Sequence, residues 1–160
     1  MSGVSISYDL SGIVAVDALL DRLDPLDGAE LLEAMARLVQ GQTRRRIYSE
    51  KTGPDGTAWP PNRKGTSILV ASEALAKSID YKVNGTEAIV GSGLRYSRIH
   101  QFGGVIRPKA GKALAFKVGG RKVVARKVTI PARPYLGVSD ANAVELLDTA
   151  VRFMRDVIGR

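Results

Sequence analysis

Apolar residues recur along the chain in patterns that predict a strand, then helices, then several strands and a last helix. Val4, Ile6 and Tyr8 alternate with polar residues, which predicts a strand. Spacings of three and four predict a helix over residues 12–23, with an apolar face of Ile13, Val16, Leu19, Leu20 and Leu23. We expect this helix to end at Asp24 and Pro25.

A longer helix is predicted from Asp27 to about residue 48. Asp27 and Glu30 have the spacing of a capping box, in which each side chain accepts a hydrogen bond from a free N–H group at the helix start. Apolar residues at helical spacing predict a core-facing stripe of Leu32, Met35 and Val39, with Leu31 and Leu38 beside it. Three bases at the end of the helix, Arg44, Arg45 and Arg46, suit the negative pole of its dipole.

A loop is predicted over residues 51–66, with a turn at Pro54-Asp55-Gly56, because proline fixes φ and glycine supplies a positive φ. We expect Trp59 to pack this loop on the core rather than to bind a ligand. A short helical patch should follow over residues 72–77. Alternation over residues 79–83, the pair Asn84-Gly85 and an apolar run over residues 88–90 then predict a β-hairpin.

The region after residue 95 predicts a helical turn over residues 96–102 and a second hairpin. Leu114, Phe116 and Val118 share one face of its first strand, and Gly119-Gly120 suits the turn. The return strand is expected to carry Val124, Val128 and Ile130 on one face. Two prolines make residues 131–134 extended.

A last helix, capped by Ser139 or Asp140, is predicted to carry an amphipathic stripe of Val144, Leu147, Val151, Met154 and Ile158. The order of elements indicates an α+β fold. It comprises an N-terminal strand and two helices, an antiparallel sheet with two hairpins, and a C-terminal amphipathic helix. The length of 160 residues, without repeats or linkers, suggests a single domain over residues 1–160.

Charge is distributed unevenly along the chain. The net charge is +8, yet residues 1–40 hold seven acids and two bases, a net charge of −5, so that the other 120 residues carry +13. No acid lies between Glu87 and Asp140, which favours a polyanion or an acidic protein surface as a partner. A solvated face balanced by the acidic N-terminal part stays open as an alternative. The candidate contacts with another subunit or with DNA are Lys112, Lys117, Arg121, Lys122, Arg126, Lys127 and Arg133.

The residue types exclude much chemistry. The chain has no cysteine and one histidine, which excludes thiolate sites and sites that need two imidazoles. We interpret His100 as a structural, hydrogen-bonded residue, because a catalytic role would need a nucleophile and an orienting acid nearby. We therefore expect no catalysis, no cofactor and no metal. No apolar run approaches a membrane span and no basic leader opens the chain, so we expect a soluble protein of the cytoplasm that makes it.

Four segments, in this order, resemble the phage virion morphogenesis family, the tail-completion type of Mu-like and related phages. They span residues 54–60, 68–79, 90–104 and 130–139, and the whole resemblance covers roughly residues 4–158. Ala74 departs from the family, which often has glycine there. The motif residues are Asp55, Gly56, Trp59, Tyr96, His100, Gln101, Phe102, Gly103, Pro131, Arg133 and Pro134. We interpret them as residues that determine the fold, with Arg133 bonding to carbonyls or to a neighbouring subunit.

The resemblance implies a non-enzymatic assembly protein of the virion, at the head-proximal end of the tail or at the neck. Such proteins are expected to form rings, of six subunits to match tail symmetry. Other copies of the chain, the tail tube or tail terminator and the head connector would be its partners, and the basic hairpin could touch DNA in the lumen. The alternative, which depends on the basic stretch alone, is a sequence-independent DNA-binding protein of a phage or prophage.

Overall fold

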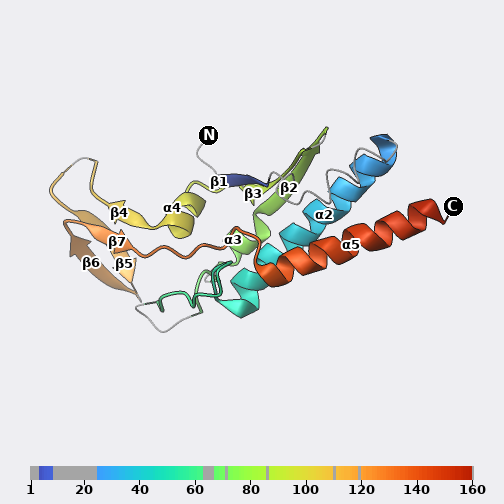
Figure 1. Ribbon diagram of the computed structural model, residues 1–160. Helices are drawn as coiled ribbons and strands as arrows, with labels where there is room; N and C mark the ends of the chain where they lie inside the picture. The colour runs from blue at the N-terminus through green and yellow to red at the C-terminus, as the bar shows by residue number, and fades with distance from the viewer. Residues whose placement is uncertain are drawn as a thin grey trace.

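The computed structural model describes residues 4–8, 25–62, 67–70, 72–85, 87–109, 111–118 and 120–159, with the backbone alone for residues 4–8 and 25–27 (Figure 1). It contains helices and small antiparallel sheets, which confirms the α+β prediction. The helix predicted over residues 12–23 lies outside the described residues.

The long helix α2 (Pro25–Arg45) begins two residues earlier than predicted. Asp27 therefore lies inside the helix, and the prediction of a capping box there was wrong. Proline is favourable in the first turn because it has no N–H group to leave unpaired. The helix continues into the π-helical turn η2 (Arg46–Glu50), and Leu32, Met35 and Val39 are buried as predicted.

The first hairpin was predicted correctly. β2 (Ile79–Asn84) and β3 (Glu87–Ser92) pair antiparallel around Gly85, whose φ is 59°. β1 (Val4–Tyr8) adds to the other side of β3, so the strand order is β1-β3-β2. The short helix α3 (Ala74–Lys77) leads into β2.

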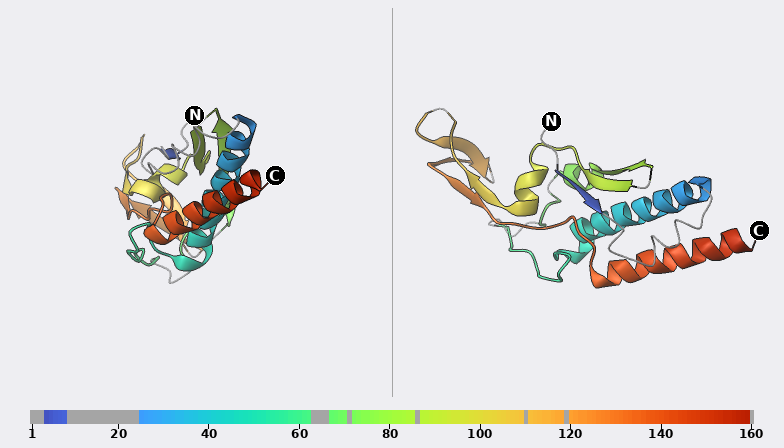
Figure 2. Two further views of the ribbon diagram at one scale, coloured as in Figure 1. Left: turned by 45° about the vertical axis from the view of Figure 1, so that its right-hand side comes forward. Right: turned by 45° about the horizontal axis from the view of Figure 1, so that its top comes forward.

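Three layers form the main part of the molecule, with α2 between the sheet and the C-terminal helix α5 (Asp140–Ile158) (Figures 1 and 2). Leu32 and Ala36 of α2 pack with Ala88 of β3. The larger core cluster joins α2, α5 and the sheet, and includes Leu31, Met35, Val39, Ile79, Val90, Leu146 and Ala150.

The apolar stripe predicted for the last helix faces away from this core. Ser139 caps α5, because its hydroxyl accepts the N–H of Asn142, as predicted. The residues that α5 buries are Asn142, Leu146 and Ala150, whereas Val144, Leu147 and Ile158 are 67%, 43% and 77% exposed. The predicted stripe is therefore present on one side of α5 but is not the side that the core buries, because helical spacing shows which residues share a face and not which face the fold covers.

The second hairpin also differs from its prediction. β5 (Leu114–Val118) and β6 (Arg121–Ala125) pair so that Phe116 opposes Val123, while Val124 opposes Ala115 on the other face. The return strand ends at Ala125, and Val128 and Ile130 belong to a separate strand, β7 (Val128–Ile130), which pairs with β4 (Gly104–Ile106). The first hairpin, β2–β3, and the second hairpin, β5–β6, lie in different sheets.

We call residues 103–132, which contain β4 to β7, the arm, and the other described residues the body. The arm projects beyond the end of the body where α5 begins, and the helix α4 (Ser97–Phe102) lies at its base (Figures 1 and 2). None of the described residues of the arm is buried.

Candidate functional site

The segments of the family motif meet where the arm joins the body. Gln101 of α4 lies at the centre of this junction. Its side-chain oxygen accepts the N–H groups of Tyr135 (2.9 Å) and Leu136 (3.0 Å), and its side-chain nitrogen donates to the carbonyl of Leu136 (3.1 Å). The hydroxyl of Tyr135 donates to the carbonyl of Ser97 (3.3 Å), and burial raises the pKa of Tyr135 to about 12. These bonds tie α4 to the segment that enters α5.

The loop after η2 is attached to the same segment. Trp59 is buried, and its indole nitrogen donates to the carbonyl of Pro134 (3.1 Å). Arg133 is only 5% exposed and donates to the carbonyls of Pro60 (3.0 Å) and Pro61 (3.2 Å). Extended prolines leave their carbonyls free of secondary structure, so a single guanidinium can satisfy two of them.

The turn in this loop has the geometry expected of its residues. Gly56 has a φ of 78°, and its N–H donates to the carbonyl of Gly53 (3.0 Å). The carboxylate of Asp55 accepts the N–H (3.0 Å) and the hydroxyl (2.8 Å) of Thr57, which lowers the pKa of Asp55. Asp55 and Gly56 are both exposed, so they shape the loop without entering the core.

Gly103 marks a close crossing of two chain segments. Its φ is 68°, and a Cβ atom there would lie 2.7 Å from the backbone nitrogen of Ala132 and 3.0 Å from the carbonyl oxygen of Ile130. Only glycine fits such a contact without displacement of the backbone. Beside this crossing, the two segments are also joined by a backbone hydrogen bond, which the N–H of Arg133 donates to the carbonyl of His100 (2.8 Å).

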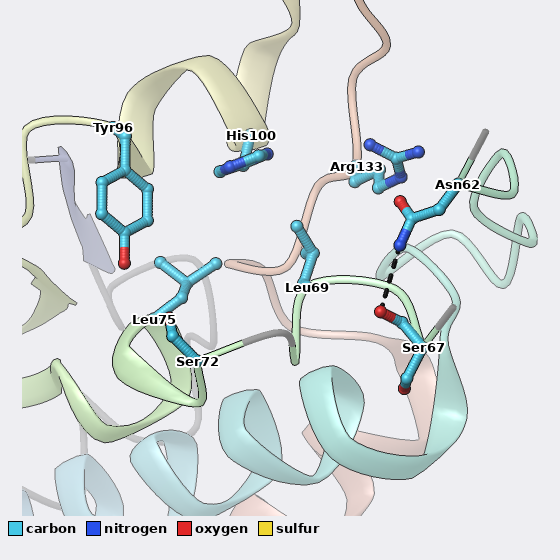
Figure 3. Close-up of a pocket in the computed structure, with 8 residues that line it drawn as sticks. All are labelled: Asn62, Ser67, Leu69, Ser72, Leu75, Tyr96, His100 and Arg133. Carbon is cyan, nitrogen blue, oxygen red and sulfur yellow. Dashed lines mark hydrogen bonds between the residues drawn. The ribbon is translucent and has the colours of Figure 1, made fainter. Parts of the chain in front are cut away.

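A small cavity of about 210 Å³ lies beside this junction (Figure 3). Its lining comprises Tyr96, which precedes α4, His100 of α4, Arg133, Leu75 of α3 and the loop residues Asn62, Ser67, Leu69 and Ser72. Tyr96 and His100 meet edge to face with ring centroids 5.8 Å apart. The cavity is smaller than the roughly 300–1,000 Å³ of most ligand sites.

The surroundings of His100 do not suit acid–base catalysis. Burial, and then the charge of Arg133, lower the pKa of His100, which favours a neutral imidazole. Its Nδ1 is buried without a hydrogen-bond partner among the described residues, so the side-chain hydrogen bond that we expected is not found there. Among the described residues, no carboxylate lines the cavity to orient the ring.

Three consecutive arginines at the end of α2 bind three different parts of the body. Arg44 donates to the carbonyl of Ile79 in β2 (2.8 Å), and Arg45 pairs with Glu145 of α5 (3.0 Å) and with Glu50 (2.8 Å). From the sequence, these arginines were assigned only to the helix dipole. Only the fact that the three arginines are consecutive indicated contacts with several elements, because three successive residues point to different sides of a helix.

Arg46 is the most buried of the three, at 1% exposure. It donates to the carbonyls of Tyr135 (3.0 Å) and Gly137 (2.9 Å) and to the side-chain oxygen of Asn142 (2.5 Å). It therefore fixes the start of α5 against α2, and neither Arg46 nor Asn142 was predicted from the sequence to make this contact.

The structure separates the seven candidate basic contacts into two groups. Six are exposed on the arm, namely Lys112, Lys117, Arg121, Lys122, Arg126 and Lys127. Arg133 is buried at the junction instead and bonds to carbonyls of its own chain. The remaining motif residues Phe102, Pro131 and Pro134 lie at the same junction. Phe102 is 60% exposed, and the centroid of its ring lies 5.8 Å from the guanidinium carbon of Arg98.

Other kinds of site are not found in the described part of the chain. There, no three acids or histidines come together as metal ligands would. Likewise, no described helix is long and apolar enough to cross a membrane.

Comparison with known proteins identifies the family. The model of the phage virion morphogenesis family matches residues 13–155. The Mu-like prophage FluMu G protein 2 of Haemophilus influenzae is 41% identical over 86 residues, which are 54% of this chain and 50% of that protein, so the chain spans about half the length of this relative. No solved structure matches the chain. With a match over most of its length, the chain belongs to the phage virion morphogenesis family, a family of structural proteins of phage assembly.

Proposed function

We propose that this chain is a tail-completion protein, which forms a ring at the head-proximal end of the tail or at the neck and joins tail to head by assembly rather than catalysis. The arm is the observation that carries this proposal. It holds eight bases and no acid, and none of its described residues is buried. Two-stranded sheets are marginal by themselves in water, so such an arm suits a protein that works in contact with others.

The proposed partners are other copies of the chain, in a ring of about six, together with the tail tube or tail terminator and the head connector. A ring needs two different surfaces on each subunit, because head-to-tail contacts are heterologous. The arm at one end and the exposed side of α5 along the body are two such surfaces. We place the chain in the virion, in the tail or the neck, after its synthesis in the cytoplasm of the host.

Deletion of the gene from a phage that carries it tests this role directly. We expect separate full heads and tails by electron microscopy of the lysate, and complete particles once the chain is supplied in trans. Light scattering on the purified protein should give a mass near six times 17.2 kDa. Complete, infectious particles without the chain would contradict the proposal.

A second candidate function is sequence-independent contact with DNA, and the charge of the arm favours it. Lys117 and Lys122 are directly opposed across β5 and β6, and both are exposed. An ion pair with phosphate would relieve their repulsion. A gel shift on random duplex DNA tests this function, and its affinity should fall steeply with salt. An assembled ring that does not bind DNA would contradict this second function.

A further inference from the structure

One face of the arm is exposed and positively charged. In the register of β5 and β6, Lys117 lies opposite Lys122 and Ala115 lies opposite Val124, so these four side chains share a face, which we call the lysine face. All four are exposed, and Val124 is 63% exposed. The other face carries Leu114, Phe116, Val118, Val123 and Ala125, all of them half-buried.

The lysine face is unfavourable in an isolated subunit. Like charges directly opposite each other destabilise a strand pair. Val124, exposed on the same face two residues along β6 from Lys122, adds apolar surface in water. No acid lies anywhere in the arm to neutralise the two ammonium groups. A partner that offered carboxylates around an apolar residue would satisfy both features.

The exposed side of α5 has this chemistry. Its outer stripe consists of Val144, Leu147, Val151, Met154 and Ile158, with Val144 67% exposed. Asp140 and Asp148 lie one turn before and one turn after Val144, on the same side of the helix, and both are exposed. No base occurs in residues 140–151, where Asp140, Glu145 and Asp148 are the charged residues. Arg152, the next base of α5, pairs with Asp148, so a lysine of another copy would share this carboxylate with Arg152.

We propose that the lysine face of one copy packs against the outer stripe of α5 of the next copy. Val124 would lie against Val144 and Leu147, while Lys117 and Lys122 would pair with Asp140 and Asp148. This inference rests on the proposed function, since it names the contact that builds the ring. The arm of one chain points away from its own α5, as Figures 1 and 2 show, so the contact must join two chains.

The contact is heterologous, and this accounts for a ring. The lysine face and the outer stripe are different surfaces of one chain, so each subunit uses the first on one neighbour and the second on the other. The charges set the register and speed the encounter, while the valines and the leucine supply apolar burial.

Cysteine cross-linking tests the contact, because the chain has no cysteine of its own. Chains that carry Val124→Cys are mixed with chains that carry Val144→Cys, both as purified protein and in particles assembled from the two variants. We expect an intermolecular disulfide between the two positions under mild oxidation. A matched mixture of Val124→Cys with Ser49→Cys, an exposed position on η2, should give at least about tenfold less product.

The outcomes separate this contact from the ring itself. A ring in which positions 124 and 144 do not cross-link would overturn the contact and leave the proposed function standing. Particles that contain no ring of the chain would overturn the proposed function, and a cross-link found there would still support the contact. A Val144→Cys thiol that is blocked in the isolated monomer would show that the same chain covers the stripe, against the proposal.

Charge reversal provides a second test. Lys117→Glu with Lys122→Glu, or Asp140→Lys with Asp148→Lys, should each weaken assembly at least about tenfold, and all four changes together should restore most of it. Lys82→Glu, at an exposed position of β2, is the matched control and should have no effect. If the arm changes abolish assembly or DNA binding and the α5 changes neither harm nor restore it, the arm contacts something else, such as DNA, and the proposal fails.

Discussion

The body and the arm differ in how they are stabilised. In the body, Arg46 is buried among three hydrogen-bond acceptors, and α2 packs on both the sheet and α5. In the arm, the described residues are at best half-buried, and two two-stranded sheets expose Val105, Ile106 and Val124. The body therefore has its own core, whereas no described residue of the arm is buried, and under the proposal above the arm would gain burial from a neighbour. Four predictions, from the largest expected effect to the smallest, test this difference.

Removal of the guanidinium at the centre of the body should have the largest effect. Arg46→Ala leaves the carbonyls of Tyr135 and Gly137 and the amide oxygen of Asn142 without this donor. We expect a loss of about 3–5 kcal/mol in the free energy of unfolding. Urea unfolding followed by the fluorescence of Trp59 measures it.

A matched surface arginine gives the control. Arg152 pairs with Asp148 on the exposed side of α5, and Arg152→Ala should change stability by less than about 0.5 kcal/mol. Equal losses for the two variants would show that Arg46 does not hold the body together.

The buried phenol of Tyr135 should make the body sensitive to alkali. Its pKa is about 12 in the folded chain against 10.0 in the ordinary case, so the unfolded chain loses the proton first as the pH rises. This contribution to stability is complete below pH 10 and is lost between about pH 10 and 12, for a total of about 2–3 kcal/mol. Urea unfolding across this range should show the loss, and Tyr135→Phe should remove it. The same loss in Tyr135→Phe would contradict the assignment.

The close crossing at the base of the arm should tolerate only glycine. In Gly103→Ala, the new methyl group would lie 2.7 Å from a backbone nitrogen at a positive φ, so we expect a loss of roughly 2 kcal/mol. Gly41 lies in α2, and no atom of another segment lies within 4 Å of the place that an added methyl group would take. Gly41→Ala should therefore stabilise the chain by about 0.5–1 kcal/mol. A neutral Gly103→Ala would show that the two segments can separate freely.

Changes on the lysine face should have the smallest effect on the isolated subunit. Val124→Ser alters a side chain that is 63% exposed, so its free energy of unfolding should change by less than about 0.5 kcal/mol. Leu146→Ala, at a fully buried position of α5, should cost about 2–5 kcal/mol. A large loss from Val124→Ser in a monomer would mean that the arm packs within its own chain.

The sequence predicted those elements that local chemistry determines. Alternating residues and the pair Asn84-Gly85 were enough for the first hairpin, and Ser139 was enough for the start of α5. The orientation of α5 was not predictable in this way. It depends on Arg46 and Asn142, which are 96 residues apart in the chain, and the apolar stripe of α5 pointed to the opposite face.

In the candidate site, too, the sequence predicted some features and not others. The motif residues Trp59, Gln101 and Arg133 could be named from the sequence, but their partners are backbone groups of other segments, which leave no pattern in the sequence. The face of Val124 was misassigned because β6 ends at Ala125, before the two bases that separate it from β7. A strand end within an alternating run has no clear sign in the sequence.

Hydrogen exchange measured on the free subunit and on the assembled particle shows whether a neighbour completes the arm. We expect weak protection of the amides of β5 and β6 in the free subunit and strong protection after assembly, while the amides of α2 are protected in both. Two results would contradict the dependence of the arm on a neighbour. In the first, the arm amides of the free subunit are as strongly protected as those of α2; in the second, assembly leaves the protection of the arm amides unchanged.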